Sequence, residues 1–242
     1  MSDQQPANQQ PPEYTPEVWI RFMAPVVPQS ATALLKVIDK KIMNGAKHLH
    51  LMISSPGGSV FHGLSIYNFL CGAPLQVTTY NFGSVDSIGV VIFCAGSHRV
   101  SVPHARFLLH GVSMQFQGQQ ALDEKDLEEK LKGLRIDYKN ISKVIADTTK
   151  RGVDDVVNDM ETRTTLDPDQ AKEYGLVHEI RSTLFPAGAD LSVINEDLTV
   201  AAAVPQPLQF KLPLQPQHFT APAVQSFSPV DSCNPGTWFR NG

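Results

Sequence analysis

The chain has 242 residues, of which 42% are apolar, and a formal net charge of −4. This length and composition predict a single domain with one sizeable core, and the mild charge with scattered basic residues argues against a nucleic-acid partner. The start of the chain lacks the features of a secretion signal, and the sequence has no run of about 18 apolar residues that would span a membrane. We therefore expect no membrane contact and a cytoplasmic location.

Both ends of the chain differ in composition from its middle. Residues 1–15 are rich in Pro and Gln, and the segment 184–242 contains the similar stretch "VPQPLQFKLPLQPQHFTAPAVQSFSP". Such stretches bury too little apolar surface to offset the entropy lost on ordering. We predict flexible tails over 1–15 and 184–242 around one domain over 16–183. The aromatic residues of the second tail leave docking onto the domain open as an alternative.

Strand-like and helical patterns alternate in the first half of the domain. Strands are predicted at "EVWIRFMAPV" (17–26), "HLHLMIS" (48–54) and "LQVTTYN" (75–81), and helices at "ATALLKVIDKKI" (31–42) and "SVFHGLSIYNFL" (59–70). This alternation predicts an α/β fold with a largely parallel sheet.

The second half begins with two short predicted strands, "HRVSV" (98–102) and "ARFLLH" (105–110), followed by a long charged helix over 122–150. Apolar residues recur along that helix in steps of four and three: Leu127, Leu131, Leu134, Tyr138, Ile141 and Ile145. Such a stripe faces the chain's own core, or it belongs to a protruding helix that packs against a second copy of itself.

The stretch "LDPDQAKEYGLVHEI" (166–180) carries start and stop signals for a short helix. Asp167 is the predicted N-cap, Pro168 the first helical residue, Gln170 the partner in a capping box and Gly175 the stop. A final strand is predicted after it.

Three segments contain residues that suit catalysis. In "ISSPGGSVFHG" a strand ends in Pro56-Gly57-Gly58, a turn whose N–H groups could receive an anion or a polarised carbonyl oxygen. In "NFGSVDSIGVV", Ser87 follows a strand and precedes an apolar helix, so it is either a nucleophile or a capping serine. In "ARFLLHGV", His110 ends a strand and could supply the base that a serine hydroxyl needs near neutral pH.

No cofactor or metal site is predicted. The three cysteines, Cys71, Cys94 and Cys233, have no paired spacing. His48 and His50 share one face of a strand, but no nearby carboxylate or cysteine completes a ligand set, so we interpret them as solvated or edge residues.

In their order and spacing, these segments resemble the proteolytic subunit of the Clp protease. "LMISSPGGSVFHGLSIYNFL" is similar to that family's strand, Ser-Pro-Gly-Gly turn and helix, "GSVDSIGVVIFCAG" to its nucleophile segment, and "RVSVPHARFLLHGV" to its histidine segment. "QGQ" at Gln117–Gln119 and "QAKEYGLVHEI" also match, and the resemblance covers about Val18 to Ile180.

The resemblance implies a single-domain ClpP/crotonase-like ββα spiral with a long protruding helix. It implies Ser87 as nucleophile, His110 as general base and the N–H groups of Gly58 and Ile88 as the oxyanion hole. The residues implied to contact the substrate are Gly57, Ser59, Val60, Gly111 and Ser113.

The resemblance also implies partners. Copies of the chain would form stacked rings around a closed chamber, with the long helix as the contact between rings, and the substrate would be a peptide or an unfolded protein. Because the sequence has no G-x-x-x-x-G-K-[ST] loop, any ATP-driven unfolding would come from a separate AAA+ ATPase ring.

One position departs from the family pattern. Arg163 occupies the place of the triad's acid, and an arginine cannot accept the histidine's N–H. The replacements considered are Asp159 first, then Glu161, Asp167 and Asp169, with Asp86 last. The sequence thus favours a serine endopeptidase, with a catalytically silent ring subunit or scaffold, or another enzyme of the same fold such as an acyl-CoA hydratase relative, as alternatives.

Overall fold

The computed structural model describes residues 16–114, 121–196 and 200–202. The predicted tail over 1–15, the motif Gln117–Gln119 and the part of the predicted second tail from residue 203 onward lie outside the described residues. None of the helices in the described ranges is long and apolar enough to cross a membrane.

The first elements alternate as predicted between strand and helix. They are β1 (Glu17–Met23), α1 (Pro28–Met43), β2 (His48–Ser55), α2 (Val60–Gly72), β3 (Gln76–Asp86) and α3 (Ile88–Cys94). The remainder is β4 (His98–Ser101), β5 (Arg106–Leu108), α4 (Glu124–Thr149), α5 (Val153–Glu161), β6 (Thr165–Leu166), α6 (Pro168–Tyr174), β7 (Glu179–Ile180), β8 (Leu191–Asn195) and β9 (Val200–Ala202).

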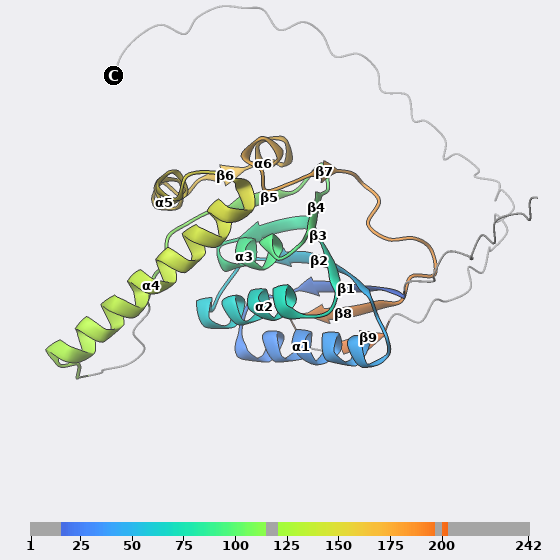
Figure 1. Ribbon diagram of the computed structural model, residues 1–242, viewed down its shortest axis with the longest axis horizontal. Helices are drawn as coiled ribbons and strands as arrows, with labels where there is room; N and C mark the ends of the chain where they lie inside the picture. Colours follow the sequence, from blue (N-terminus) through green and yellow to red (C-terminus); the bar gives the residue numbers. More distant parts are fainter. Residues whose placement is uncertain (1–15, 115–120, 197–199, 203–242) are drawn as a thin grey trace, which may run out of the picture. The chain divides into compact units, whose positions relative to one another are not determined.

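The strands form one mostly parallel sheet in the order β6-β5-β3-β2-β1-β8-β9, and β4 joins β3 to β7 beside this path. Only the β5–β6 and β8–β9 pairs in the described part of the chain are antiparallel. The helices α1, α2 and α3 lie side by side over one face of the sheet (Figure 1). Every residue of α3 is buried, so this helix passes through the core. The predicted α/β fold with a parallel sheet is confirmed.

Strand β3 is longer than predicted and divides its pairing between two strands. Its first part pairs with β4, from Thr78 to Asn81, and its last part pairs with β5, from Ser84 to Asp86. At the division, the Asn81 side chain donates to the Arg106 carbonyl at 2.8 Å and accepts from the Gly83 N–H at 3.0 Å. Because β3 and β5 run parallel, the residues that follow their ends meet at one edge of the sheet.

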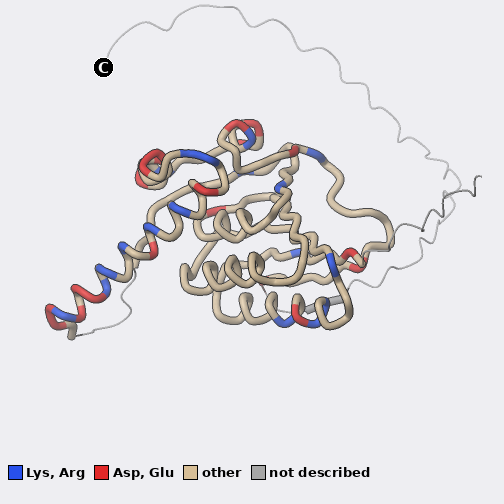
Figure 2. The backbone as a smooth tube through the Cα atoms, in the orientation of Figure 1, with Lys and Arg blue, Asp and Glu red and all other residues tan. Residues whose placement is uncertain are grey.

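The apolar stripe of α4 is buried in the core at one end and exposed at the other. Ile141 and Ile145 are buried in the core, whereas Leu127 and Leu131 remain 50% and 48% exposed. Figure 1 shows the N-terminal turns of α4 running away from the sheet, and Figure 2 shows basic and acidic residues along these turns. The C-terminal part of the stripe thus packs against the chain's own core, and the N-terminal part has no cover within the described residues.

The local signals for α6 are confirmed. Asp167 accepts from the Gln170 N–H at 2.8 Å, and the Gln170 side chain accepts from the Asp167 N–H at 2.9 Å, which completes the capping box. Pro168 is the first helical residue, and Gly175 ends the helix at φ +92°.

Two sequence expectations are corrected here. Strand β8 lies within the predicted tail 184–242, yet it pairs in parallel with β1 and its Ile194 is fully buried. The folded part therefore extends beyond residue 183. The apolar run "LSVIN" is only five residues long, and the Pro- and Gln-rich composition of the segment that follows it obscures it in the sequence.

The second correction concerns His48 and His50. Strand β2 lies between β1 and β3, so His50 is buried instead of solvated. The register of the sheet places Glu17 of β1 directly opposite His48. Sequence spacing missed this carboxylate because it comes from a different strand.

Candidate active site

The paired glycines form a turn that contacts Ser87. The backbone at Val26 holds the turn: its N–H donates to the Gly57 carbonyl at 2.7 Å, and its carbonyl accepts from the Ser59 N–H at 2.8 Å. Gly57 and Gly58 have φ values of +86° and +143°, which disfavour residues with a side chain. A Cβ on Gly57 would lie 2.6 Å from the Ser87 Cβ. The two glycines therefore allow the turn to approach Ser87 closely.

Ser87 occupies the junction between β3 and α3 in a strained conformation. Its φ of 59° and ψ of −128° lie outside the regions that non-glycine residues normally adopt. Although it is the N-cap residue of α3, its side chain makes no capping hydrogen bond. Its N–H donates to the Leu108 carbonyl at 2.8 Å, which connects it to β5 two residues before His110. The hydroxyl does not serve as a helix cap.

A small cavity joins the three candidate segments. It measures about 70 Å³ and is lined by Gly58, Val60, Ser87, Ile88, His110, Gly111, Val112, Ser113 and Ile141. Most of the predicted site residues thus lie around one space. Two predicted residues do not line the cavity. Gly57 lies against Ser87, and Ser59 lies at the start of α2, where its hydroxyl pairs with His62 Nδ1 at 2.8 Å.

Sequence reasoning missed two of the lining residues, Val112 and Ile141. Ile141 belongs to the apolar stripe of the long helix, but the stripe's periodicity does not show which of its members reaches the cavity. The ring of Tyr138, also in the stripe, lies 3.2 Å from the position of a Cβ on Gly111. Helix α4 therefore forms one wall beside the histidine segment.

Two backbone N–H groups in the cavity wall are free to bind a ligand. Those of Gly58 and Ile88 make no hydrogen bond to an acceptor among the described residues. The N–H of Ile88 also belongs to the first turn of α3, where helix geometry leaves donors unpaired and the helix dipole favours negative charge. Together they form a candidate binding point for an oxygen that carries developing negative charge.

His110 is held by a backbone carbonyl. Its Nδ1 lies 2.8 Å from the Gly111 carbonyl oxygen, which can only accept. Nδ1 therefore carries the proton, and Nε2 of the neutral ring keeps its lone pair, as a general base requires. Ser87 and His110 line the same cavity, but they are not hydrogen-bonded to each other.

The candidate acids have other partners. Asp159, ranked first from the sequence, accepts from the Tyr174 hydroxyl at 2.7 Å, and burial together with this hydrogen bond raises the pKa of Tyr174. Asp86 accepts from Ser84 at 2.7 Å and from Arg106 at 2.9 Å. Among the described residues, none of these carboxylates is bonded to His110.

Of the three remaining acid candidates, Glu161 and Asp169 are exposed, and Asp167 is the N-cap of α6. Arg163 is exposed, with φ +57°, and precedes Thr164, whose carbonyl accepts from the Leu109 N–H at 2.9 Å. The expected acid position therefore lies next to the histidine strand, and the residue there is a cation.

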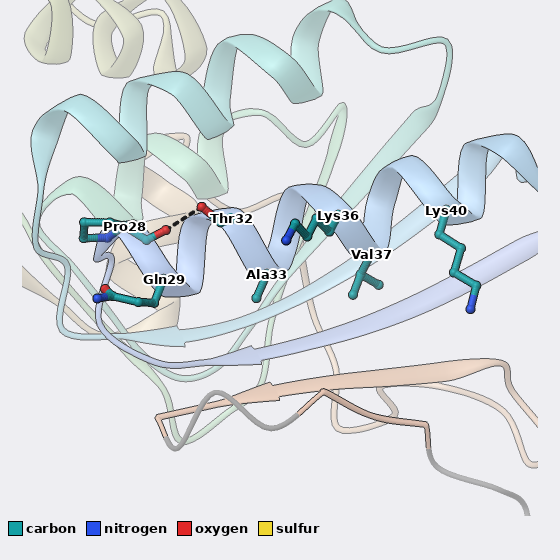
Figure 3. Close-up of a pocket in the computed structure, with 7 residues that line it drawn as sticks. All are labelled: Pro28, Gln29, Thr32, Ala33, Lys36, Val37 and Lys40. Atoms are coloured by element: carbon teal, nitrogen blue, oxygen red, sulfur yellow. Dashed lines mark hydrogen bonds between the residues drawn. The ribbon is translucent and has the colours of Figure 1, made fainter.

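A larger hollow of about 620 Å³ lies elsewhere, along α1. Its described lining residues all come from that helix: Pro28, Gln29, Thr32, Ala33, Lys36, Val37 and Lys40 (Figure 3). The Thr32 hydroxyl donates to the Pro28 carbonyl at 2.8 Å, and the ionisable groups shown are two lysines. The described residues around this hollow include no pairing of a nucleophile with a base, so the smaller cavity is the candidate active site.

A serine at a strand-to-helix junction, a histidine with a free Nε2 and unpaired N–H groups around one cavity are together typical of α/β serine hydrolases. A family model described as Clp protease matches residues 18–183, and the chain belongs to this family.

Comparisons with individual proteins agree with this assignment. Over 156 residues the chain is 31% identical to the ATP-dependent Clp protease proteolytic subunit 3 of Rhodococcus jostii, covering 64% of this chain and 73% of that protein. Over 149 residues it is 33% identical to the ATP-dependent Clp protease proteolytic subunit of Bdellovibrio bacteriovorus, covering 61% and 70%. A solved structure of a ClpP1 mutant from Listeria monocytogenes matches with a TM-score of 0.62 at 22% identity, covering 68% of this chain and 91% of that one. The predicted ClpP-like fold is confirmed.

Proposed function

We propose that this chain is a serine endopeptidase that hydrolyses peptide bonds of peptides or unfolded proteins inside an oligomeric chamber. The observation that carries the proposal is the Ser87 hydroxyl, which does not cap its helix and shares a small cavity with His110. A residue held at an unfavourable φ and ψ at the start of a buried helix is a frequent feature of catalytic sites.

The chemistry follows from the roles available in this cavity. Ser87 Oγ attacks the carbonyl carbon of the scissile bond, and His110 Nε2 accepts its proton. The carbonyl oxygen becomes an oxyanion, which the N–H groups of Gly58 and Ile88 stabilise. His110 then gives the proton to the leaving amine, and water, deprotonated by the same histidine, hydrolyses the acyl-enzyme.

The Gly111 carbonyl provides one of the two functions of a triad acid, the orientation of the histidine ring. It holds His110 in the tautomer that leaves Nε2 free, but it carries no full negative charge to stabilise the imidazolium. Loss of a triad acid typically lowers kcat by about 10⁴-fold. We therefore expect an activity that is slower than that of a complete triad but still measurable.

Labelling with a fluorophosphonate, read by intact mass, tests the nucleophile. The wild-type chain should gain one adduct, because an activated serine attacks phosphorus as it attacks a carbonyl carbon. Ser87→Ala and His110→Ala should both remove the adduct. Ser113→Ala is the matched control, since Ser113 lines the same cavity and its loss should leave the adduct in place. An adduct that persists in Ser87→Ala would contradict the proposal.

A catalytically silent ring subunit is the second candidate. The observation in its favour is Arg163 at the acid position, together with carboxylates at Asp86 and Asp159 that are bonded to other residues. A wild-type particle that assembles correctly and gains no adduct would support this candidate.

The assembly belongs to the same proposal. Copies of the chain would form stacked rings through the exposed N-terminal turns of α4, where Leu127 and Leu131 present apolar surface. The relatives from Rhodococcus and Bdellovibrio are named ATP-dependent. We accordingly propose an AAA+ ATPase ring as unfoldase partner, and the cytoplasm as location.

A further inference from the structure

A cluster of possible metal ligands lies where β1 and β2 begin. The oxygens of the Glu17 carboxylate, Nδ1 of His48 and Nε2 of His50 provide ligand atoms that all lie within 4.8 Å of one another. Glu17 Oε1 is 3.7 Å from His48 Nδ1, and Glu17 Oε2 is 3.8 Å from His50 Nε2. None of the three residues lines the candidate active site, which follows the opposite ends of the strands.

The far side of each imidazole is held by a hydroxyl on β3. His48 Nε2 lies 2.8 Å from Thr78 Oγ1, and His50 Nδ1 lies 2.8 Å from the Tyr80 hydroxyl. The indole of Trp19 stacks on the His50 ring at 4.5 Å with the planes only 4° apart. Metal-binding histidines are usually oriented in this way, by a hydrogen bond from the ring nitrogen that does not bind the ion.

The remaining nitrogen of His50 has no hydrogen-bond partner in the described part of the chain. His50 is only 9% exposed, and its Nε2 makes no hydrogen bond to any described residue. The Glu17 oxygen at 3.8 Å is too distant to accept one. A buried polar atom without a partner is unfavourable and calls for an explanation such as an ion.

We propose that Glu17, His48 and His50 bind a divalent transition-metal ion, with Zn²⁺ as the best match. Two imidazoles and one carboxylate form a recognised zinc ligand set with a further position open to water. Since zinc lies about 2.0–2.2 Å from such ligands, two ligand atoms of one ion are at most about 4.4 Å apart. Both carboxylate-to-imidazole distances are within this limit. The ion would fasten β1 to β2 and stabilise the folded chain.

Equilibrium dialysis of the full chain against Zn²⁺, without an affinity tag and followed by metal analysis, tests this site. Wild type should bind one equivalent more than Glu17→Gln or His48→Ala, or bind that equivalent at least about tenfold more tightly. Zn²⁺ should also raise the thermal unfolding midpoint of wild type but not of either variant, because an ion that binds only the folded state stabilises it.

Glu17→Gln and the control His104→Gln both change exposed side chains. The Glu17 side chain is 46% exposed, so Glu17→Gln removes a ligand charge without opening the core. His104→Gln, an exposed histidine outside the cluster, should bind Zn²⁺ as wild type does. Equal zinc binding by wild type, Glu17→Gln and His48→Ala would overturn the proposal, as would a wild-type chain that binds no zinc at micromolar concentration.

Discussion

Gly57 lies directly against Ser87, the candidate nucleophile. Its backbone has φ +86°, and a Cβ there would lie 2.6 Å from the Ser87 Cβ and 2.7 Å from the Asp86 carbonyl oxygen. Gly45 has nearly the same φ, +87°, but nothing within 4 Å of the place where a Cβ would be. A substitution at Gly45 therefore tests the cost of the backbone conformation alone, whereas the same substitution at Gly57 also crowds Ser87.

We expect Gly45→Ala to lower the free energy of unfolding by about 1–2 kcal/mol through its backbone conformation alone. Gly57→Ala should lower it further and displace Ser87, and a displacement near 1 Å can reduce hydrolysis by about 10²-fold. Urea unfolding and peptide hydrolysis, measured on both variants, check this prediction. Equal hydrolysis by the two variants would show that the turn does not position the serine.

At the scale of elements, α4 is divided between two environments. Its C-terminal half buries Ile141 and Ile145, which anchor the helix to the core, whereas Leu127 and Leu131 in the N-terminal half are about half exposed, at 50% and 48%. Burying one such leucine fully contributes about 1.5–3 kcal/mol. Burying the remaining exposed half of both leucines in a contact between copies would thus contribute about 1.5–3 kcal/mol per chain.

Changing Leu131→Glu and Leu134→Glu together should shrink the particle on a sizing column with light scattering, while circular dichroism stays unchanged. The physical reason is that charges on this stripe would have to be buried in the contact. The matched control is Lys125→Glu with Lys132→Glu, two exposed positions on the opposite side of the same helix. A particle of unchanged size in the leucine variant would argue against α4 as the contact.

At the scale of the whole molecule, β8 extends the sheet beyond β1. It pairs in parallel with β1 and buries Val193 and Ile194, so the segment after residue 183 contributes to the same core as the active-site strands. β1 therefore has a neighbour on both sides, β2 and β8.

Ile194→Ala should lower the free energy of unfolding by about 2–5 kcal/mol, because it leaves a cavity at a fully buried position. Leu191→Ala in the same strand is the control, since Leu191 is only partly buried and its loss should cost less. Chemical denaturation of both variants provides the comparison. A loss for Ile194→Ala no larger than for Leu191→Ala would contradict the inclusion of β8 in the core.

The fold class, the ends of α6 and part of the candidate site follow from local sequence signals. The alternation of strand and helix patterns predicted the parallel α/β fold, and Asp167, Gln170 and Gly175 predicted the start and end of α6. The flanks of Ser87 and His110 predicted two of the segments that border the cavity. These features depend on residues that are close together in the chain, where periodicity and capping rules apply.

The contacts between distant segments were decided only by the tertiary structure, because these contacts depend on which strands pair and in what register. The pairing of β5 with the end of β3 connects the Ser87 N–H to the carbonyl of Leu108, within the histidine segment. Asp159 of α5 accepts a hydrogen bond from Tyr174 of α6 and not from His110. The register of β1 on β2 brings Glu17 opposite His48. Each of these contacts joins distant parts of the chain, and local sequence patterns carry no information on such distances.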